Sequence, residues 1–314
     1  MPGGRLVFSS SVLAVSHHPQ VRRLLTTNSA SRRLVGRFVA GDDLDTATAP
    51  IRTLVERGLL VTVDHLGEDV TDAADATATR DAYVALLDRL DGLGLAHAVE
   101  VSVKLSALGQ ALPRDGGRIA LDHAAAICAA AARAGTTVTL DMEEHTTVDS
   151  TLEILAILRR EHPWVGAVLQ SALRRTEADA ADLARAGSRV RLVKGAYAEP
   201  ASVAHAAKAE VDQAYLRCLR ILMTGPGYPM VATHDMGMVE AARAMAVVHG
   251  RSADDHEYQM LYGIRTTEQD RIAASGDRMR IYLPYGADWY GYFTRRLAER
   301  PANLAFFLRS LLSR

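Results

Sequence analysis

Short apolar runs alternate along the chain with longer segments in which apolar residues recur at helical spacing. The short runs are rich in β-branched residues, which is typical of buried parallel strands. Eight such runs occur, at Leu60–Val63, Ala98–Lys104, Thr136–Asp141, Val165–Gln170, Val190–Lys194, Met230–His234, Tyr258–Leu261 and Met279–Leu283. Because eight alternating strands and helices close a parallel sheet and remove its edges, we predict an α/β fold with one (β/α)₈ barrel.

A doubly wound sheet is the other fold that this alternation permits. Such a sheet normally has fewer strands and an early G-x-G-x-x-G fingerprint, which the chain lacks. A length of 314 residues suits one barrel with a leader, since α/β barrels commonly use roughly 200–250 residues. Pro19–Arg57 has a helical pattern of mixed basic and apolar residues. We therefore expect a helical leader over residues 1–58, packed on a barrel over residues 59–314.

Composition and charge exclude several classes of protein. With 48% hydrophobic and 23% charged residues, the chain is predicted to be globular. Its 36 basic and 37 acidic residues are interspersed, so it lacks the basic field that nucleic-acid binding requires. The two cysteines, in helical patterns without a C-x-x-C, indicate reduced core thiols. With no long apolar run and no secretory signal, a cytoplasmic location is expected.

Polar residues end five of the predicted strands. They are Lys104, Asp141, Gln170, Lys194 and His234. In a barrel, the carboxyl ends of the strands form the active-site face. Together with Arg191 these residues include more cations than carboxylates, and a buried charge is costly unless it is paired. We therefore expect a bound anion at this mouth, either a phosphate, a cofactor pyrophosphate or a substrate carboxylate.

A further helical pattern follows the last strand after a Pro-Tyr-Gly turn. Tyr292, Arg295, Arg296 and Glu299 stand at i, i+3, i+4 and i+7 and so share one face. The planar fork of arginine binds carboxylates bidentately, and a tyrosine ring offers apolar surface. This face predicts the binding of a small amino acid.

Several stretches of the chain resemble the proline dehydrogenases in their short, single-function bacterial form. They are SVKLSALG (102–109), LDMEEHTTVDSTL (140–152), VLQSALRRTEAD (168–179), RVRLVKGAY (189–197), ATHD (232–235), YQMLYGIR (258–265) and RIYLPYGADWYGYFTRRLAERPANLAFFLRSLL (280–312). A single short stretch such as ATHD can arise by chance, but together they run in order over most of the chain. The resemblance implies a distorted (β/α)₈ barrel that holds FAD non-covalently, with the last helix over the mouth.

The resemblance also implies roles for individual residues. The substrate carboxylate would pair with Lys104, Arg295 and Arg296, supported by Asp141. The substrate ring would lie among Leu261, Tyr282 and Tyr292. The flavin would be contacted by Met142, Gln170, Arg191, Val193, Lys194, Gly195, Ala196, Tyr197, Thr233, His234 and Glu299. Of these, Arg191 would lie near flavin N5, while Lys194 and His234 suit the pyrophosphate chemically.

The reaction implied by the resemblance is the oxidation of L-proline to Δ1-pyrroline-5-carboxylate, the first step of proline catabolism. A hydride would pass from C5 of proline to N5 of the flavin, with solvent as a candidate acceptor for the proton on nitrogen. Nothing resembles the aldehyde dehydrogenase or DNA-binding parts of fused relatives, so a quinone or other membrane acceptor is expected to take the electrons. The leader, with Leu24, Leu25 and Leu34, either contacts the inner face of the membrane or packs on the barrel.

Three other functions remain open. Lys104 or Lys194 could form a Schiff base with a carbonyl substrate, as in barrel aldolases. Metal-capable side chains occur at Glu143, Glu144, His145 and His234. Their spacing contains no H-x-H or H-E-x-x-H, so no metal site is expected. The third alternative is a catalytically silent sensor of flavin or proline.

Overall fold

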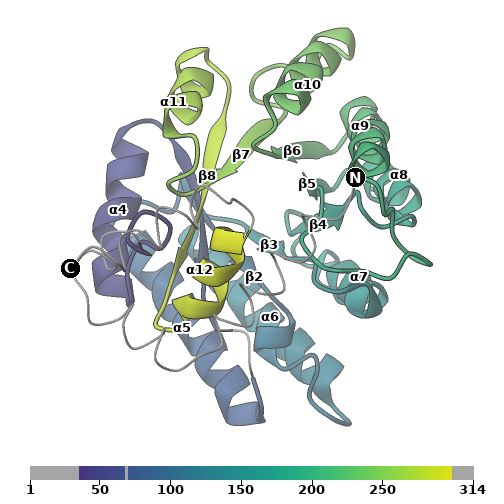
Figure 1. Cartoon of the computed structure of the whole chain (residues 1–314). Coiled ribbons are helices and arrows are strands. Elements are labelled where there is room, and N and C mark those ends of the chain that lie inside the picture. The colour runs from purple at the N-terminus through teal and green to yellow at the C-terminus, as the bar shows by residue number, and fades with distance from the viewer. Residues whose placement is uncertain (1–34, 68–69, 299–314) are drawn as a thin grey trace, which may run out of the picture.

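Eight parallel strands close into a barrel in chain order in the computed structural model, which describes residues 35–67 and 70–298 (Figure 1). The strands are β1 (Leu60–His65), β2 (Val99–Val103), β3 (Val138–Leu140), β4 (Gly166–Gln170), β5 (Arg189–Val193), β6 (Tyr228–Ala232), β7 (Glu257–Leu261) and β8 (Met279–Tyr285). The barrel closes where β1 pairs with β8, in a register that runs from Leu60 opposite Arg280 to His65 opposite Tyr285. The predicted (β/α)₈ barrel is confirmed.

The bounds of several strands differ from the prediction. β6 begins at Tyr228 rather than Met230, and β8 continues to Tyr285 rather than Leu283. Lys104, Asp141 and Lys194 directly follow their strands instead of closing them. The backbone N–H of Asp141 still donates to the carbonyl of Val103 at 2.8 Å. The chain turns away after these residues, which leaves their side chains at the rim of the barrel.

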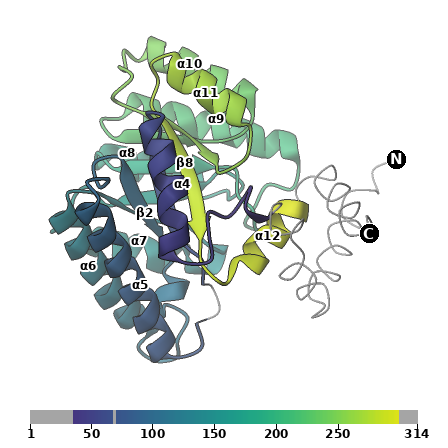
Figure 2. The same ribbon diagram turned by 90° about the vertical axis from the view of Figure 1, so that its left-hand side faces the viewer.

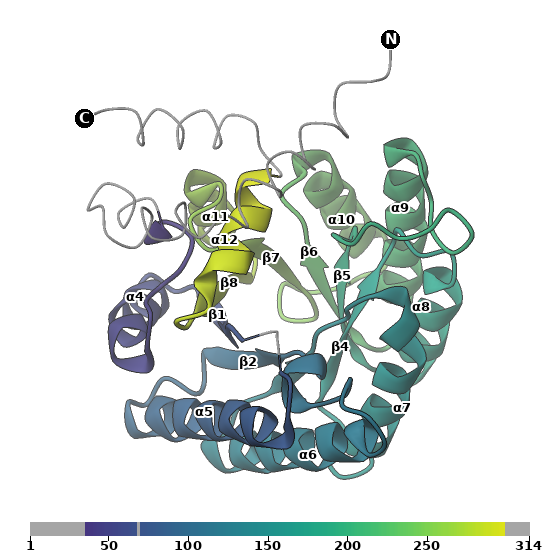
Figure 3. The same cartoon turned by 60° about the horizontal axis from the view of Figure 1, so that its bottom comes forward.

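Helices surround the strands as an outer ring (Figure 3). They are α5 (Ala73–Gly92), α6 (Gly116–Ala134), α7 (Val148–Leu158), α8 (Thr176–Arg185), α9 (Lys208–Thr224), α10 (Met236–Val248) and α11 (Thr266–Ala274), with short 3₁₀ turns η1 (Ser106–Leu108) and η2 (His145–Thr147). Local sequence explains their ends. The Asp72 side chain accepts from two backbone N–H groups at the start of α5, and Gly135 ends α6 with φ 73°.

Two helices depart from the regular βα order. α4 (Leu44–Glu56) contacts β1 and β8, and its Ile51 and Leu54 are buried in the barrel core. α12 (Trp289–Ala298), which follows β8, lies at the mouth instead (Figure 2). α4 thus covers the outward face of β1 and β8, which a helix after β8 would otherwise cover. This packing is that of α4 alone. Leu24, Leu25 and Leu34 lie outside the described residues, and the division into a leader over residues 1–58 and a barrel over residues 59–314 stays a prediction.

A second small core holds α12 at the mouth. Its buried members are Val35, Phe38, Val39, Leu66, Ile264, Trp289, Tyr292 and Phe293. Phe293 is fully buried, and its ring centroid lies 6.2 Å from that of Phe38. Burial of these rings orients α12 so that its Tyr292 lines the barrel mouth. Within the described ranges, no helix has both the length and the apolar character needed to cross a bilayer.

Candidate active site

A cavity of about 420 Å³ opens at the carboxyl ends of the strands. This volume lies within the range of small-molecule sites, roughly 300–1,000 Å³. The cavity brings together the predicted residues Lys104, Asp141, Met142, Gln170, Arg191, Val193, Lys194, Gly195, Ala196, Tyr197, Thr233, His234, Leu261, Tyr282 and Tyr292. It also includes residues that the sequence analysis missed, namely Asp64, Val168, Ala232, Gln259 and Met260.

Three predicted residues lie beyond what the structure describes. Arg295 and Arg296 belong to α12, but their side chains are outside the described part, and Glu299 follows it. Their contacts with substrate or flavin therefore stay predictions. Tyr292, earlier on the same helix, is only 8% exposed and lines the cavity.

The ammonium of Lys104 is held by a buried carboxylate from the first strand. Lys104 Nζ donates to both carboxylate oxygens of Asp64, at 2.9 and 2.8 Å, and lies 3.8 Å from Asp141. Burial raises the pKa of Asp64, while the charge of Lys104 opposes that rise. Asp64 follows an apolar run just as Asp141 does, and this signal could have found it.

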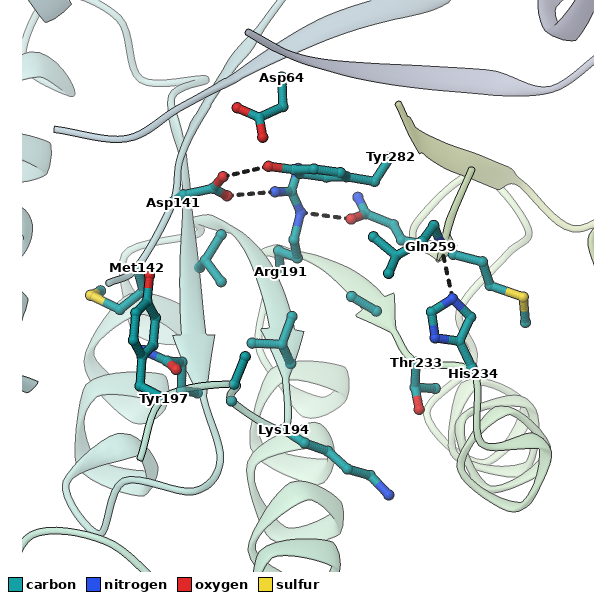
Figure 4. Close-up of a pocket in the computed structure, with 18 of the residues that line it drawn as sticks. Asp64, Asp141, Met142, Arg191, Lys194, Tyr197, Thr233, His234, Gln259 and Tyr282 are labelled. Carbon is teal, nitrogen blue, oxygen red and sulfur yellow. Dashed lines mark hydrogen bonds and ion pairs between the residues drawn. The ribbon is translucent and has the colours of Figure 1, made fainter. Parts of the chain in front are cut away.

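Asp141 links the aromatic side of the cavity to its most buried cation. Tyr282 donates its hydroxyl to Asp141 Oδ2 at 2.7 Å, and Arg191 Nη1 donates to Oδ1 at 2.8 Å (Figure 4). The guanidinium carbon of Arg191 lies 5.2 Å from the centroid of the Tyr282 ring, a cation–π distance. Burial and the charge of Asp141 raise the pKa of Tyr282 well above its usual value. Tyr282 therefore remains a hydrogen-bond donor.

Arg191 is 3% exposed and is held from several strands. Its Nη1 also donates to Ser102 Oγ at 2.9 Å, its Nε to Gln259 Oε1 at 2.6 Å, and its Nη2 to Glu100 Oε1 at 3.4 Å. A guanidinium has five N–H donors. These bonds leave one N–H of Nη2 without an acceptor among the described residues, so Arg191 can donate to a ligand in the cavity.

Lys194 lies between two carboxylates at the opposite side of the cavity from Asp141 (Figure 4). Its Nζ donates to Asp212 at 2.5 Å and to Asp235 at 3.0 Å. Burial alone would lower the pKa of Lys194, but these hydrogen bonds outweigh burial and raise it. In the described part of the mouth, each of Lys104, Arg191 and Lys194 is paired with carboxylates. The excess of positive charge expected from the sequence is therefore not present there, because Asp64, Asp212 and Asp235 were not counted.

Gly195 and Gln170 shape the cavity wall after β5. Gly195 has φ +108°, and a Cβ added there would lie 3.1 Å from Gln170 Oε1 and 3.1 Å from the Cβ of Ala172. Gln170 Nε2 donates to the carbonyl of Glu143 at 2.7 Å, which directs its Oε1 toward Gly195. Only glycine both adopts this conformation without strain and leaves the wall open for a planar ligand to approach.

His234 accepts a backbone hydrogen bond at the edge of the cavity. Its Nε2 accepts from the N–H of Leu261 at 3.0 Å, so in the neutral ring the proton lies on Nδ1 (Figure 4). The donor set as a whole suits a flavin. Arg191 offers an N–H, Gln170 offers an amide, and Gly195 leaves space beside apolar walls from Val168, Val193 and Met260.

The alternative chemistries find less support. No group of three or more His, Cys, Asp or Glu side chains in the described part of the chain is arranged to hold a metal ion. Instead, His145 pairs with Glu199, and Glu143 accepts from Ser106 Oγ at 2.6 Å. A Schiff-base lysine must be an unprotonated amine, whereas Lys104 and Lys194 both donate to carboxylates at ion-pair distance.

Comparisons with known proteins agree with this geometry. The family model of proline dehydrogenase matches residues 47–309. The chain is 40% identical over 308 residues to proline dehydrogenase of Deinococcus radiodurans, covering 98% of both chains. It is 38% identical over 287 residues to proline dehydrogenase 2 of Bacillus subtilis strain 168, covering 91% of this chain and 93% of the relative.

A solved structure of similar fold is proline utilization A from Bdellovibrio bacteriovorus, inactivated by N-propargylglycine. The TM-score is 0.79 at 26% sequence identity, and the match covers 86% of this chain. The chain spans only 33% of that longer protein. The likeness is therefore to one part of the larger chain.

Proposed function

The chain belongs to the proline dehydrogenase family, and we propose that it oxidises L-proline with a non-covalently bound FAD in the cavity at the barrel mouth. It is an enzyme that acts on proline, in the first step of proline catabolism. The observation that carries the proposal is the buried Arg191, anchored beside the Tyr282–Asp141 pair with an N–H left for a ligand.

When bound, FAD would supply at N5 the hydride acceptor for the oxidation of proline at C5 to Δ1-pyrroline-5-carboxylate. The role of the chain is to place the two reactants. Arg191 would donate a hydrogen bond near N5, while Gln170 and Gly195 would form the wall against the ring system. Met142, Val193, Ala196, Tyr197, Thr233 and Glu299 would also contact the flavin, and Lys194 and His234 would bind its pyrophosphate.

At the substrate end, we propose that cationic side chains bind the proline carboxylate and that apolar and aromatic side chains surround its ring. Arg295 and Arg296 pair with the proline carboxylate, and Lys104 adds a third donor. Because Lys104 is already paired with Asp64, the two arginines supply most of the attraction for the carboxylate. Leu261, Tyr282 and Tyr292 surround the ring, so the chain contributes chiefly by positioning C5. Solvent takes the proton from the proline nitrogen.

The electrons then pass to a quinone or another membrane acceptor. We propose a cytoplasmic enzyme whose leader, residues 1–58, packs on the barrel of residues 59–314; contact of the leader with the inner face of the membrane is the alternative. Co-sedimentation with anionic phospholipid vesicles tests that contact. A protein that stays in the supernatant in the presence of the vesicles contradicts it.

An absorption spectrum before and after addition of L-proline tests the main proposal. Purified protein, reconstituted with FAD, is expected to show oxidised flavin bands that bleach on anaerobic addition of L-proline. D-proline, which presents C5 and the carboxylate in mirror-image positions, is the matched control and should bleach the bands far more slowly. A protein that takes up no flavin, or whose flavin does not respond to L-proline, contradicts the proposal. Turnover with an artificial acceptor separates the enzyme from a silent sensor.

A further inference from the structure

A chain of buried polar side chains crosses the barrel interior below the cavity, from β8 through β7 to β5. Arg280 donates to Glu257 from Nε at 2.7 Å and from Nη2 at 3.1 Å. Gln259 Nε2 donates to Glu257 Oε1 at 2.5 Å, and Gln259 Oε1 accepts from Arg191 Nε at 2.6 Å. All four side chains are less than 8% exposed, so water does not readily replace these bonds.

The chemistry of its two neighbours determines how the Gln259 amide is oriented. The carboxylate of Glu257 can only accept, and the guanidinium of Arg191 can only donate. The amide NH₂ must therefore face Glu257, and the amide oxygen must face Arg191, because the opposite orientation would bring donors together. A leucine can satisfy neither neighbour, and a glutamate can satisfy both only when it is protonated.

The Arg191 guanidinium is held at two positions. Gln259 accepts a hydrogen bond from its Nε, and Asp141 and Ser102 accept hydrogen bonds from its Nη1. Nη1 is directed to Asp141 and Ser102, while Nε is directed to Gln259, with the plane beneath Tyr282 (Figure 4). This attachment at two edges fixes the plane of the guanidinium. It thereby also fixes the direction of the remaining N–H of Nη2.

A competing carboxylate lies on the side of Arg191 away from the mouth. Glu100 Oε1 is 3.4 Å from Arg191 Nη2, longer than the contact with Gln259. Although burial alone would raise it, the guanidiniums of Arg280, Arg189 and Arg191 lower the pKa of Glu100 to about 2. Glu100 is therefore charged and attracts Arg191 toward the barrel interior. Without Gln259, the buried Nε–H would lack an acceptor, and the guanidinium would gain by turning toward Glu100.

We propose that Gln259 is a positioning residue, which keeps the Arg191 guanidinium directed at the flavin against the attraction of Glu100. This inference rests on the proposed function, in which Arg191 contacts flavin N5. Gln259 acts through Arg191, and Glu257, itself fixed by Arg280, holds Gln259 in the required orientation.

The test compares Gln259→Leu with the wild type and with Gln110→Leu. Gln110 is a matched control, because its amide also bonds two side chains, Ser150 at 2.8 Å and Thr151 at 3.3 Å, but does not line the cavity. The measurements are the spectrum of bound flavin, its rate of reduction at saturating L-proline, KM, and the thermal midpoint. We expect Gln259→Leu to bind flavin with an absorption band shifted from that of the wild type. Its reduction rate should be lower than the wild-type rate by about tenfold or more, since the buried Nε–H of Arg191 loses its acceptor. Its KM for L-proline should stay within about twofold of the wild-type value. Gln110→Leu should lose stability without a change in rate or spectrum.

Gln259→Glu provides a second readout, the pH profile of flavin reduction. Protonated glutamate reproduces the donor and acceptor of glutamine, whereas its anion faces the carboxylate of Glu257. Burial and like charge raise the pKa of such a carboxyl. Several titratable or charged groups face position 259 or its direct partners. They are Glu257 (β7), Arg191 (β5), Arg280 and Tyr282 (β8), Tyr228 (β6), Glu100 (β2) and Asp141, which follows β3. The variant should reduce its flavin at nearly the wild-type rate at low pH and lose rate as pH rises, with an ionisation that the wild type lacks.

The outcomes separate this inference from the proposed function. If wild-type flavin does not bleach with L-proline, the proposed function fails and this inference fails with it. If the wild type bleaches but Gln259→Leu matches Gln110→Leu in rate and spectrum, only the role of Gln259 is overturned. If Gln259→Leu does not fold, the Gln259→Glu profile decides, and a profile parallel to that of the wild type overturns the role.

Discussion

Replacing Glu100 by glutamine tests how far the buried charges of the barrel interior stabilise the fold. Glu100 is 1% exposed and faces Arg189 at 2.7 Å, with Arg191 at 3.4 Å and Arg280 at 3.9 Å. Glutamine has almost the same shape but no charge, and its NH₂ group would face donors. The substitution therefore leaves buried guanidiniums without part of their compensating charge.

The magnitude follows from the pKa of Glu100. The three arginines lower this pKa from 4.5 to about 2, although burial opposes them. At about 1.4 kcal/mol per pKa unit, this difference corresponds to roughly 3 kcal/mol of stability at pH 7. Because the folded-state pKa is lowered, the contribution is present above the unfolded-state pKa and is lost as pH falls toward 2. At pH 3 about 1.4 kcal/mol of it should remain.

Urea unfolding followed by far-UV circular dichroism measures the effect at pH 7 and pH 3. The Glu100→Gln variant should be less stable than the wild type by roughly 3 kcal/mol at pH 7 and by about half of that or less at pH 3. Thr62→Val is the matched control, since Thr62 donates a hydroxyl to the same carboxylate at 2.8 Å. Its cost, about 1.5 kcal/mol for a hydrogen bond to a charged group, should change much less between the two pH values, because Glu100 is still mostly ionised at pH 3. A Glu100→Gln deficit that is equal at both pH values, or larger at pH 3, would refute the reasoning.

Three further results are expected. Asp64→Asn should lower the free energy of unfolding by about 1 kcal/mol, because Lys104 loses both hydrogen bonds to the carboxylate and keeps only Asp141 at 3.8 Å, while relief of the buried Asp64 charge offsets part of the loss; unchanged urea unfolding would contradict this. Gly195→Ala should lower the ratio of flavin to protein after dialysis, since the new Cβ approaches Gln170 at 3.1 Å, whereas Gly187→Ala, also at positive φ but with no atom within 4 Å, should retain flavin. Burial raises the pKa of both cysteine thiols to about 12, so a thiol reagent at pH 8 should label neither in the native protein and both in urea.

The strands were predictable because both of their faces are buried. Val61, Val63 and Val101, fully buried in the core, lie in runs of β-branched residues that the amino-acid pattern reveals directly. The placement of α4 on the barrel wall and of α12 at the mouth does not follow from the helical pattern itself; only the family resemblance implied a last helix over the mouth. Both segments have a helical pattern, but the pattern does not say which surface a helix covers. The small core around Phe38 and Phe293 decides that, and its members come from distant parts of the chain.

In the candidate site, too, some residues were predictable from the sequence and others were not. Lys104 and Asp141 were found because each is a charged residue directly after a buried strand, and in a barrel this position belongs to the active-site face. Gln259 was missed because it stands between the apolar residues Tyr258 and Met260 in β7. This alternation is typical of a strand whose polar face is exposed to solvent. Closure of the barrel turns that face inward, toward Arg191 on β5.

From its sequence alone, the chain can be assigned a (β/α)₈ barrel with Lys104, Asp141, Gln170, Lys194 and His234 at its mouth, because burial and strand order impose local patterns on the amino acids. The other predicted lining residues were implied by the family resemblance. The tertiary structure decided which charges compensate one another. Lys104 pairs with Asp64 across 40 positions of the chain, and Arg191 pairs with Asp141 across 50. Electrostatic interaction depends on distance in space, and only closure of the barrel brings these residues within hydrogen-bonding distance.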